Sequence, residues 1–375
     1  MRYVVLGLSI TSSWGNGHAT TYRGLIKALA DRGHDVLFLE RDVPWYASHR
    51  DLAEPPFGRT VLYASRAELE REHAQAVRDA DVVIVGSYVP EGIEVARWAI
   101  DTARGITAFY DIDTPITVAS VMRGEAEYLD RDLIPRFDLY LSFSGGPMLE
   151  RLERELGARM ARPLYCSVDP SLYAPAPAPA RWQLGYLGTY SVDRQPTVEA
   201  LLLGPARRLS AESFVVAGAQ YPSELAWPPN VERISHVAPA SHARFYAEQR
   251  YTLNVTRVEM VRAGYSPSVR LFEAAACGTP IISDAWEGIE EVLTPGREVL
   301  IARTSDDVIA YLRELSERER SALATRARAR VLQQHTASHR ALELDGYVRE
   351  LMKSPPGAPA KGEQGQATWA EEALP

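Results

Sequence analysis

One pattern occurs twice along the chain: short apolar runs of strand length alternate with amphipathic segments of helical length. Runs with so few polar residues are typical of parallel strands that are buried on both faces. In the first half, the expected strands are residues 3–8, 35–40, 82–86, 107–110, 139–143 and 164–168, and the expected helices are 20–32, 93–104 and 147–156. In the second half, the expected strands are 184–188, 214–217, 231–236, 252–255, 280–283 and 299–302, and the expected helices are 241–249, 267–277 and 306–315. The sequence therefore predicts an α/β protein with two Rossmann-like, doubly wound domains, and ligands of such sheets bind at the carboxyl ends of the strands.

A change of composition separates the two halves. Prolines interleaved with alanine fit neither a helix nor a central strand, and they stand at positions 170, 175, 177 and 179. We therefore expect domains at residues 1–170 and 171–335, followed by a helix at 336–352. Residues 353–375 contain few large apolar side chains, and we expect this tail to be disordered.

The charge and the cysteine content exclude several classes of protein. The formal net charge of −8 gives no general attraction to nucleic acid, so no nucleic-acid partner is expected. No run approaches 18 consecutive apolar residues, so no transmembrane segment is expected. This observation does not exclude peripheral contact with a membrane. The two cysteines, Cys166 and Cys277, make neither a disulfide framework nor a metal cluster, and the cytoplasm is the default compartment.

The segment from residue 262 to residue 284 is the most informative for chemistry. A loop containing Gly264 leads into a predicted helix that begins near Pro267, a residue suited to a first helical turn. The free N–H groups of such a turn can bind a phosphate, and Arg262 and Arg270 can add positive charge. Glu273 lies farther along the same helix, where a carboxylate could accept hydrogen bonds from ribose hydroxyls. The alternative is that Glu273 is an ordinary helix carboxylate and that Arg270 is its solvated neighbour.

These residues resemble the donor-binding signature of the GT-B glycosyltransferases of the GT4-like group. The closer resemblance is to the CgeB-type, or spore-maturation-protein-like, glycosyltransferases. It rests on residues 266–273 (SPSVRLFE) and 187–196 (LGTYSVDRQP), and it covers about residues 160 to 350. The resemblance implies a GT-B fold with a central cleft between the domains and a C-terminal helix that crosses back to the first domain. It also implies that Glu273 binds the nucleotide ribose and that Arg194 lies near the pyrophosphate.

The resemblance extends to a full set of donor-binding residues. The region of His236 and Val237 would touch the base through its backbone groups. The predicted donor-binding residues are Gly15, Gly17, Arg194, His236, Val237, Arg262, Gly264, Tyr265, Ser266, Pro267, Ser268, Val269, Arg270 and Glu273. The sequence departs from the pattern at Tyr265, because many GT4-like enzymes carry a second glutamate there. Sugar recognition must therefore differ, and a retaining outcome is less strongly implied.

The first loop, residues 12–18, follows a predicted strand and precedes a predicted helix. Gly15 and Gly17 allow a ligand phosphate or sugar to approach the backbone closely. His18 is a candidate catalytic residue that acts on the acceptor or the leaving group, and the alternative is a histidine that caps the helix. Thr20 stands where a dinucleotide-binding G-x-G-x-x-G loop has its third glycine, which argues against a dehydrogenase.

Asp111 and Asp113 follow a predicted core strand and resemble, by their letters, a metal-binding D-x-D pair. GT-B enzymes generally use a helix dipole and basic side chains instead, so we expect neither a metal ion nor a cofactor. Asp111 stands where many GT4-like enzymes have a histidine in the cleft, and it is our second candidate catalytic residue. The alternative role for Asp111, capping of the following helix, suits Asp113 or Thr114 better.

Together these features predict a hexosyltransferase-like glycosyltransferase that needs no metal ion. It would move a sugar from a nucleotide diphosphate sugar, with UDP as the expected nucleotide, to an acceptor hydroxyl. The acceptor could be a glycan, a lipid-linked molecule or a small molecule. Two alternatives share the fold: a nucleotide-sugar epimerase, and a non-catalytic scaffold that binds a nucleotide or a glycan.

Overall fold

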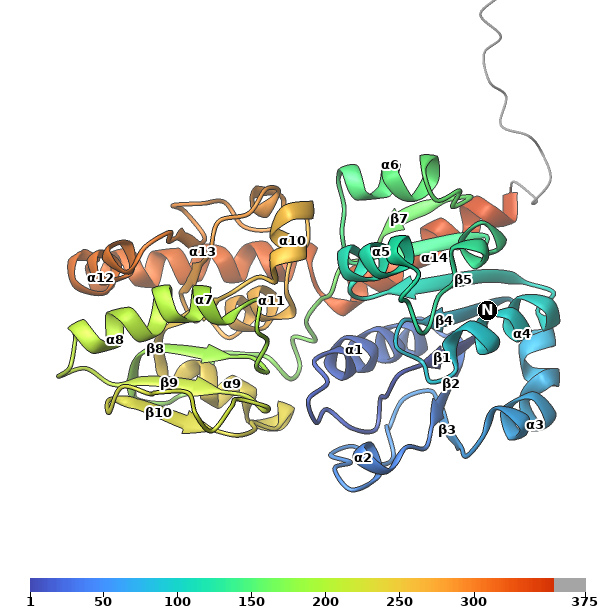
Figure 1. Cartoon of the computed structure of the whole chain (residues 1–375), viewed down its shortest axis with the longest axis horizontal. Coiled ribbons are helices and arrows are strands. Elements are labelled where there is room, and N and C mark those ends of the chain that lie inside the picture. Colours follow the sequence, from blue (N-terminus) through green and yellow to red (C-terminus); the bar gives the residue numbers. More distant parts are fainter. Residues whose placement is uncertain (354–375) are drawn as a thin grey trace, which may run out of the picture.

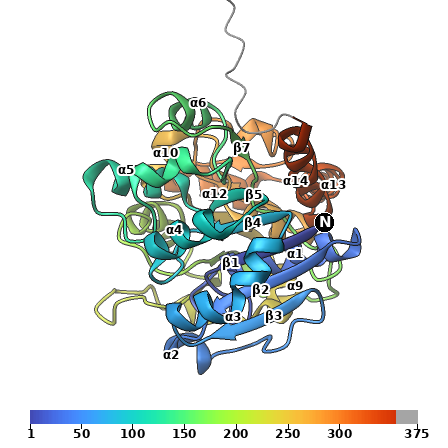
Figure 2. The same cartoon turned by 90° about the vertical axis from the view of Figure 1, so that its right-hand side faces the viewer.

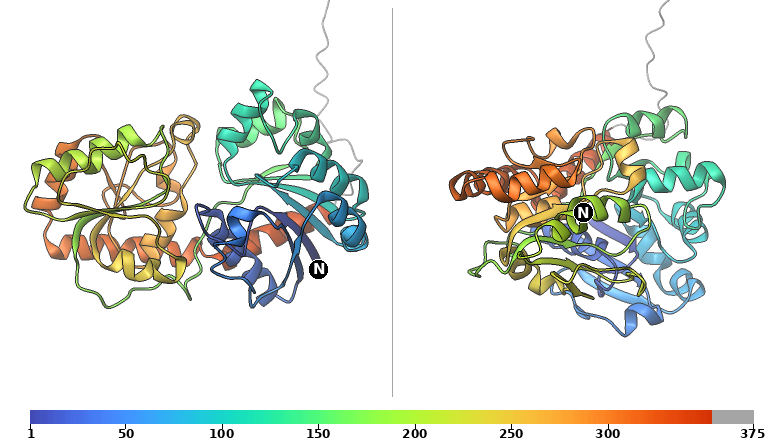
Figure 3. Two further views of the ribbon diagram at one scale, coloured as in Figure 1. Left: turned by 60° about the horizontal axis from the view of Figure 1, so that its bottom comes forward. Right: turned by 60° about the vertical axis from the view of Figure 1, so that its left-hand side comes forward.

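Two lobes lie side by side in the computed structural model, which describes residues 1–353 (Figure 1). Each lobe has one parallel sheet with helices on both faces, and this layering is clear for both lobes in Figure 3. The two sheets have the same organisation, because in each the first strand of the lobe lies between the second and the fourth. A crevice for ligands forms at the carboxyl ends of strands where the order reverses in this way.

The N-terminal lobe contains a seven-stranded sheet in the order β3-β2-β1-β4-β5-β6-β7. Its strands are β1 (Arg2–Gly7), β2 (Asp35–Arg41), β3 (Arg59–Tyr63), β4 (Val82–Gly86), β5 (Ile106–Asp111), β6 (Leu139–Ser142) and β7 (Ala161–Pro163). Its helices are α1 (His18–Asp31), α2 (Pro44–Ala47), α3 (Arg66–Asp79), α4 (Gly92–Thr102), α5 (Thr114–Arg123), the 3₁₀ helix η1 (Arg131–Arg136) and α6 (Pro147–Arg154).

The C-terminal lobe contains a six-stranded sheet in the order β10-β9-β8-β11-β12-β13. Its strands are β8 (Trp182–Leu187), β9 (Phe214–Ala217), β10 (Val231–Ile234), β11 (Gln249–Asn254), β12 (Ile281–Ser283) and β13 (Leu300–Ile301). Its helices are α7 (Gln195–Val198), the π-helical turn η2 (Glu199–Leu203), α8 (Gly204–Arg208), α9 (Pro239–Ala247), α10 (Val258–Ala263), α11 (Val269–Ala276), the 3₁₀ turn η3 (Ile289–Glu291), α12 (Ser305–Glu314) and α13 (Glu317–Gln334).

Strand β1 shows why the apolar runs form covered parallel strands. Successive side chains of a strand point to opposite faces of the sheet. Tyr3 and Val5 belong to the hydrophobic cluster that includes α1, whereas Val4 and Leu6 belong to the cluster on the opposite face. All four side chains are almost completely buried, so both faces need apolar residues and the run has no polar alternation.

The last helix, α14 (Ala337–Lys353), leaves the C-terminal lobe and packs against α1 of the N-terminal lobe (Figure 2). Asp345, which is buried on α14, accepts hydrogen bonds from the Tyr3 hydroxyl at 3.1 Å and from Arg32 Nε at 2.9 Å. The chain therefore crosses between the lobes twice. The two crossings are paired, because Val168 donates its N–H to the His335 carbonyl and accepts a hydrogen bond from the Ala337 N–H.

The structure confirms the predicted two-domain architecture with a returning C-terminal helix. It adds β3 and α3, which the sequence pattern did not predict, and it places β7 at Ala161–Pro163, whereas we expected a strand at residues 164–168. β3 is an edge strand whose side chains are mostly half-buried, so its hydrophobic signal is weak. Lys353 is the last residue of α14, and the rest of the tail that we expect to be disordered lies outside the described residues.

Candidate functional site

A cavity of about 640 Å³ lies between the two lobes, at the ends of their parallel strands. This volume is within the range of small-molecule binding pockets, about 300–1,000 Å³. The N-terminal lobe contributes residues of the first loop, of α1 and α2, and of the ends of β4 and β5. The C-terminal lobe contributes residues from the loops after β8, β9, β10 and β11 and from the start of α11.

The start of α11 forms part of the C-terminal wall of this cavity, as the phosphate-site prediction requires. Ser268 is the N-cap residue, and Ser268, Val269 and Arg270 all line the cavity. The Ser268 hydroxyl does not cap the helix but donates to Asn254 Oδ1 at 2.5 Å. The first turn thus has no side-chain cap, and its N–H groups and positive dipole end can receive an anion.

The predicted start of this helix at Pro267 was wrong by two residues. Pro267 precedes the N-cap residue, and its carbonyl accepts a hydrogen bond from the Cys166 thiol of the N-terminal lobe at 3.2 Å. Pro267 still lines the cavity, together with the first residues of α11. The proline fixes the approach to the helix and does not form its first turn.

Arginines supply the positive charge of the C-terminal wall. Arg270 is buried, donates from Nε to the Leu187 carbonyl at 2.6 Å, and stacks 4.7 Å from the Tyr186 ring centre. Arg194 donates from Nη2 to the Thr189 carbonyl at 2.7 Å. Its Nε atom is buried without a hydrogen-bond partner among the described residues, so it can bind a further acceptor.

A third arginine, Arg257, also lines the cavity, and the sequence analysis did not select it. Its guanidinium lies between two carboxylates, with 3.6 Å from Nη1 to Asp113 Oδ2 and 3.6 Å from Nε to Asp193 Oδ2. Asp113 belongs to the N-terminal lobe and Asp193 to the C-terminal lobe, so Arg257 links the two walls. No local sequence signal distinguishes Arg257 from the many surface arginines.

Arg262, in contrast, was wrongly assigned to the donor site. Its side chain is 70% exposed and pairs with Glu259 one turn earlier on α10. Arg262 is absent from the lining of the cavity, so it does not contribute charge to the phosphate site.

Glu273 is buried in the cavity wall, and groups from both lobes surround its carboxylate. Oε2 accepts a hydrogen bond from the Tyr246 hydroxyl at 3.0 Å, and Oε1 accepts one from the Thr20 hydroxyl at 3.4 Å. His242 Nδ1 lies 3.7 Å from Oε2. A carboxylate has about four acceptor sites, so Glu273 keeps capacity for ligand hydroxyls.

His242 is a site residue that the sequence analysis missed. Its Nε2 contacts the Val237 carbonyl at 3.0 Å, and its Nδ1 contacts the Tyr173 hydroxyl at 3.1 Å. Because the carbonyl can only accept, Nε2 carries the hydrogen and Nδ1 accepts from the tyrosine. His242 thereby fixes the backbone at Val237, which lines the cavity beside His236.

The predicted donor residues Gly264, Tyr265 and Ser266 do not line the cavity, and Tyr265 and Ser266 contact the N-terminal lobe instead. The Ser266 hydroxyl lies 2.5 Å from the Ser144 hydroxyl of the N-terminal lobe. A Cβ atom added to Gly146 would lie 2.5 Å from the Tyr265 ring, which shows how closely the ring packs on that glycine. Tyr265 and Ser266 therefore form a contact between the lobes, whereas Gly264 packs against Glu287 of its own lobe.

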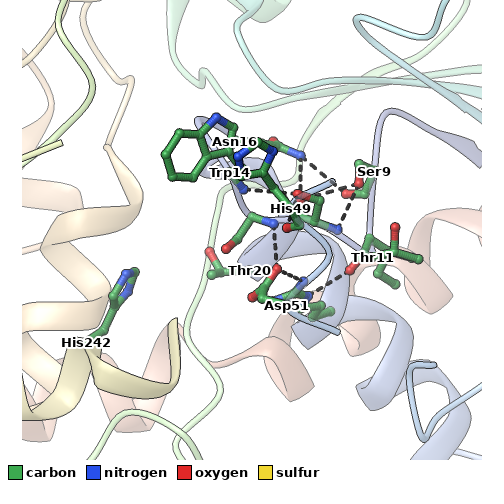
Figure 4. A network of polar contacts seen from close by, with 12 residues as sticks. Ser9, Thr11, Trp14, Asn16, Thr20, His49, Asp51 and His242 are labelled. Carbon is green, nitrogen blue, oxygen red and sulfur yellow. Dashed lines mark hydrogen bonds and ion pairs between the residues drawn. The ribbon is translucent and has the colours of Figure 1, made fainter. Parts of the chain in front are cut away.

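A buried hydrogen-bond network holds the first loop in place (Figure 4). Glu40, at the end of β2, accepts from the hydroxyls of Ser9 and Thr11 at 2.9 and 2.6 Å and from the N–H groups of Ile10 and Thr11. Gly15 and Gly17 line the cavity, and a Cβ atom at either would meet no protein atom within 4 Å. The network thus presents an open backbone surface to a ligand.

The same loop reaches toward the C-terminal lobe. The Trp14 ring stacks on His49 with 4.3 Å between ring centres, and its centre lies 4.9 Å from that of His236. Figure 4 shows this loop on one side and His242 on the other. Burial lowers the pKa of His236, and the neighbouring His242 lowers it further.

His18 and Asp113 face each other on the N-terminal wall of the cavity. His18 Nε2 lies 4.0 Å from Asp113 Oδ2, and the Tyr88 hydroxyl donates to the same oxygen at 2.8 Å. Burial lowers the pKa of His18, Asp113 opposes this effect, and Arg257 adds to it. The imidazole is therefore neutral at neutral pH and can accept a proton.

Asp111 does not line the cavity, contrary to its selection as a catalytic candidate. Its side chain is fully buried and accepts from the Tyr140 hydroxyl at 2.5 Å and the Thr117 hydroxyl at 2.7 Å. Burial raises the pKa of Asp111 to about 6, although these two hydrogen bonds oppose the shift. Asp113, two residues later, is the member of the D-x-D pair that lines the cavity, so the pair is divided between core and cavity.

Within residues 1–353, no three or more His, Cys, Asp or Glu side chains are grouped so that they could hold a metal ion. Within the same residues, no helix combines the length and the apolar character that a membrane span requires.

The two facing lobes and the returning helix define the GT-B fold. Residues 194–346 match a protein family described as glycosyl transferase-like. No curated protein matches the chain. Sucrose-phosphate synthase from Thermosynechococcus elongatus is similar in structure, with a TM-score of 0.69 and 14% identity over 95% of this chain and 100% of that chain.

Other solved glycosyltransferase structures are also similar to this chain. HepE from Anabaena, in complex with UDP and glucose, is similar with a TM-score of 0.67 and 14% identity over 94% of this chain and 100% of that chain. An alpha-glucosyltransferase in complex with UDP is similar with a TM-score of 0.68 and 14% identity over 93% of this chain and 100% of that chain. At this level of identity the likeness shows the fold, and it confirms the GT-B prediction.

Proposed function

We propose that this protein transfers a sugar from a nucleotide diphosphate sugar to an acceptor hydroxyl. One observation carries the proposal: a single cavity has an uncapped helix start and arginines on one wall and a neutral histidine beside a carboxylate on the other. The first wall suits a diphosphate, and the second suits a hydroxyl that must lose its proton. The glycosyl transferase-like match and the UDP complexes of similar structures support this assignment.

In this proposal the diphosphate lies against the start of α11, near Arg194 and Arg270. The backbone N–H groups and guanidinium groups stabilise the negative charge that develops as the diphosphate leaves. Glu273 accepts hydrogen bonds from the ribose hydroxyls, and the backbone at His236 and Val237 lies at the base. We propose UDP as the nucleotide and CgeB-type proteins as the nearest group, because the sequence signature around Glu273 is of that type.

The chemical step follows from the two walls. The bond between the anomeric carbon and the phosphate oxygen breaks, and its electron pair leaves with the diphosphate. The acceptor oxygen forms the new bond to the anomeric carbon, and its proton passes to His18. Asp113 stabilises the imidazolium that results, as a carboxylate beside a catalytic histidine does. No step of this sequence uses Asp111, which lies in the core.

The first test is calorimetry with UDP. Wild-type protein should bind UDP, and Glu273→Ala should bind it about tenfold to a hundredfold more weakly, because hydrogen bonds to a charged group contribute about 1.5–3 kcal/mol. Arg262→Ala, on the exposed face of α10, is the matched control and should bind like wild type. Equal affinities of wild type and Glu273→Ala would remove Glu273 from the ribose role.

The second test identifies the reaction. Mass spectrometry of the nucleotide sugar that copurifies with the protein names the donor, which is then incubated with and without acceptors. Transfer requires that free UDP and a glycosylated product appear together and depend on the acceptor. An epimerised nucleotide sugar formed without any acceptor would instead establish an epimerase. An intact donor after long incubation with many acceptors would establish a binding scaffold.

A further inference from the structure

The charged residues that line the cavity are divided unequally between its two walls. The C-terminal wall contains the three arginines Arg194, Arg257 and Arg270. Among its described lining residues, the N-terminal wall has no Lys or Arg, and its one carboxylate is Asp113, which faces His18. Two of the three arginines, Arg194 and Arg270, lie on the proposed diphosphate side of the cavity. An acceptor bound to the N-terminal wall therefore meets a carboxylate and no free cation of its own lobe.

Arg257 does not change this balance, although it reaches across to the N-terminal wall. Its guanidinium lies 3.6 Å from both Asp113 and Asp193. A phosphate on the acceptor would have to approach a cation that two carboxylates already neutralise. Like charges at such short range in a partly buried site repel each other strongly. The acceptor region thus disfavours phosphorylated and other anionic molecules.

The same wall offers uncharged hydrogen-bonding groups that have no partner. Ser13 is 8% exposed and lines the cavity, and its hydroxyl has no hydrogen-bond partner among the described residues. Nδ1 of His18 is likewise buried without a partner in the described part of the chain. Buried polar atoms are normally paired, so these two atoms mark positions that ligand hydroxyls can satisfy. Hydroxyls of the Thr20, Thr21 and Tyr88 side chains lie in the same lining.

An aromatic side chain completes this wall. Trp45, on the short helix α2, lines the cavity and is 57% exposed, the largest exposed aromatic side chain of the described residues. Its backbone carbonyl accepts a hydrogen bond from His49, and its ring centre lies 6.0 Å from that of the buried Tyr46. A pyranose ring has C–H groups on its face, and the negative face of an indole attracts such groups while covering apolar surface. Hydroxyls at the edge of the sugar remain free for Ser13 and His18.

We propose, on the basis of the proposed transferase function, that the acceptor is the hydroxyl of an uncharged sugar. The sugar ring stacks on Trp45, its hydroxyls bind Ser13 and His18, and the reacting hydroxyl gives its proton to His18. The diphosphate side of the cavity keeps the arginines for the donor. This assignment distinguishes an uncharged saccharide acceptor from a sugar phosphate and from an acceptor that has no sugar.

The test uses the full-length protein, the copurified nucleotide sugar and matched acceptor pairs. Methyl glycosides of glucose, mannose and N-acetylglucosamine are compared with the 6-phosphates of the same three methyl glycosides, and with octanol as a sugar-free alcohol. At least one uncharged glycoside should be glycosylated at a rate at least tenfold above its phosphate. Higher rates with the sugar phosphates or with octanol would overturn the proposal while leaving the transferase function intact.

Variants of Trp45 test the stacking contact. Trp45→Ala should raise the KM for the uncharged acceptor about tenfold with little change in kcat or in UDP affinity. Trp45→Phe, which keeps an aromatic face, should recover most of this loss, and Ser13→Ala should raise the same KM severalfold. An unchanged acceptor KM in Trp45→Ala would overturn the role of Trp45.

Binding measurements keep the two proposals separable. Saturable quenching of tryptophan fluorescence by methyl glycosides, with UDP present, should be lost in Trp45→Phe. If wild type binds UDP but shows no such binding and no transfer to any glycoside, the acceptor proposal fails alone. If wild type binds no nucleotide at all, the proposed transferase function fails. Glycoside binding measured without UDP then shows whether the sugar site exists independently of that function.

Discussion

The backbone N–H of Gly145 donates a hydrogen bond to the carbonyl of Tyr265 at 2.9 Å, and this bond joins the N-terminal lobe to the C-terminal lobe. Tyr265 adopts a positive φ of 49°, which is uncommon for a residue with a side chain. Its ring packs against Gly146 on one lobe and against Gly288 on its own lobe. The position that carries a glutamate in many GT4-like enzymes is therefore used here to hold the lobes together.

A substitution of Gly146 should disturb this seam. Gly146 has a φ of +54°, and a Cβ atom there would lie 2.5 Å from the Tyr265 ring. Its ψ of −141° also lies outside the left-handed helical region, so Gly146→Ala should lower stability by more than the about 1–2 kcal/mol that a left-handed alanine costs. It should also raise the KM for the donor, because the lobes cannot close on the ligand in the same way.

Gly157→Ala is the matched control for that experiment. Gly157 also has a positive φ, of +75°, but a Cβ atom there meets Pro135 of the same lobe at an ordinary 3.6 Å. Urea unfolding should therefore show a smaller loss of unfolding free energy for Gly157→Ala than for Gly146→Ala. Kinetic measurements on Gly157→Ala should show an unchanged KM for the donor. Equal losses and equal KM values for the two variants would contradict the role of the seam.

The phosphate site predicts different outcomes for two arginines. Arg194→Gln should weaken UDP binding about tenfold or more, since a charge-assisted hydrogen bond to phosphate contributes about 1.5–3 kcal/mol. UDP affinity should also become less dependent on salt in this variant. Arg262→Gln removes the same charge from the exposed face of α10 and should change neither quantity. Calorimetry at two ionic strengths checks both expectations, and parallel losses in the two variants would argue for a general charge effect.

The proposed catalytic role of His18 predicts the pH dependence of kcat/KM. Burial lowers the pKa of His18 below its usual 6.5, and the neutral form is the one that accepts a proton. The value of kcat/KM should therefore stay constant above pH 6.5 and fall only at lower pH. Asp113→Asn removes the group that raises this pKa, so the acid limb should move to still lower pH while kcat falls.

Asp111 provides the necessary control, because burial raises its pKa to about 6 and it titrates in the same range. The acid limb should persist in Asp111→Asn, whereas His18→Gln should lose both the limb and a rate factor on the order of 10²–10⁴. If the acid limb of the pH profile disappears in Asp111→Asn and remains in His18→Gln, Asp111 and not His18 is the group that titrates in catalysis.

His335, which is buried, should make the stability of the fold sensitive to acid. Burial and, as a smaller cause, the positive charge of Arg340 lower the pKa of His335 to about 3, and Arg340 donates to its Nδ1 at 2.8 Å. The folded state then binds fewer protons than the unfolded state between about pH 6.5 and pH 3, so stability falls as the pH falls through this window. From pH 7.5 to pH 5, His335 should account for a loss of about 2 kcal/mol.

Denaturant unfolding of His335→Gln measures this contribution, because glutamine keeps an acceptor near Arg340 but does not titrate. The variant should lose less stability than wild type between these two pH values. Identical pH dependences of wild type and variant would show that His335 does not limit acid stability.

The fold was predictable because each lobe repeats a pattern whose cause is local. A strand covered on both faces needs apolar residues throughout, and β4 and β9 satisfy this need completely. Edge strand β3 does not, since one side of it faces no further strand and its residues are half-buried. The start of α11 and Glu273 were predictable for the same reason, because their spacing along one helix places them on one wall.

The rest of the site depends on contacts between the lobes, which no local pattern records. Asp111 and Asp113 are equivalent by sequence, but the side chain of Asp111 points into the core, where Tyr140 and Thr117 bind it. Arg257 differs from Arg262 only because Asp113 of the other lobe lies opposite it. Trp45 lies more than two hundred residues from α11 and meets the same cavity only after both lobes fold.

The paired crossings at Val168 and residues 335–337 determine how a single lobe could be produced. A fragment that stops at the first crossing would lack α14, and the apolar side of α1 and the hydroxyl of Tyr3 would lose their cover. An isolated N-terminal lobe therefore has to be built with an internal deletion, in which residues 337–353 are joined to Val168 through a short linker.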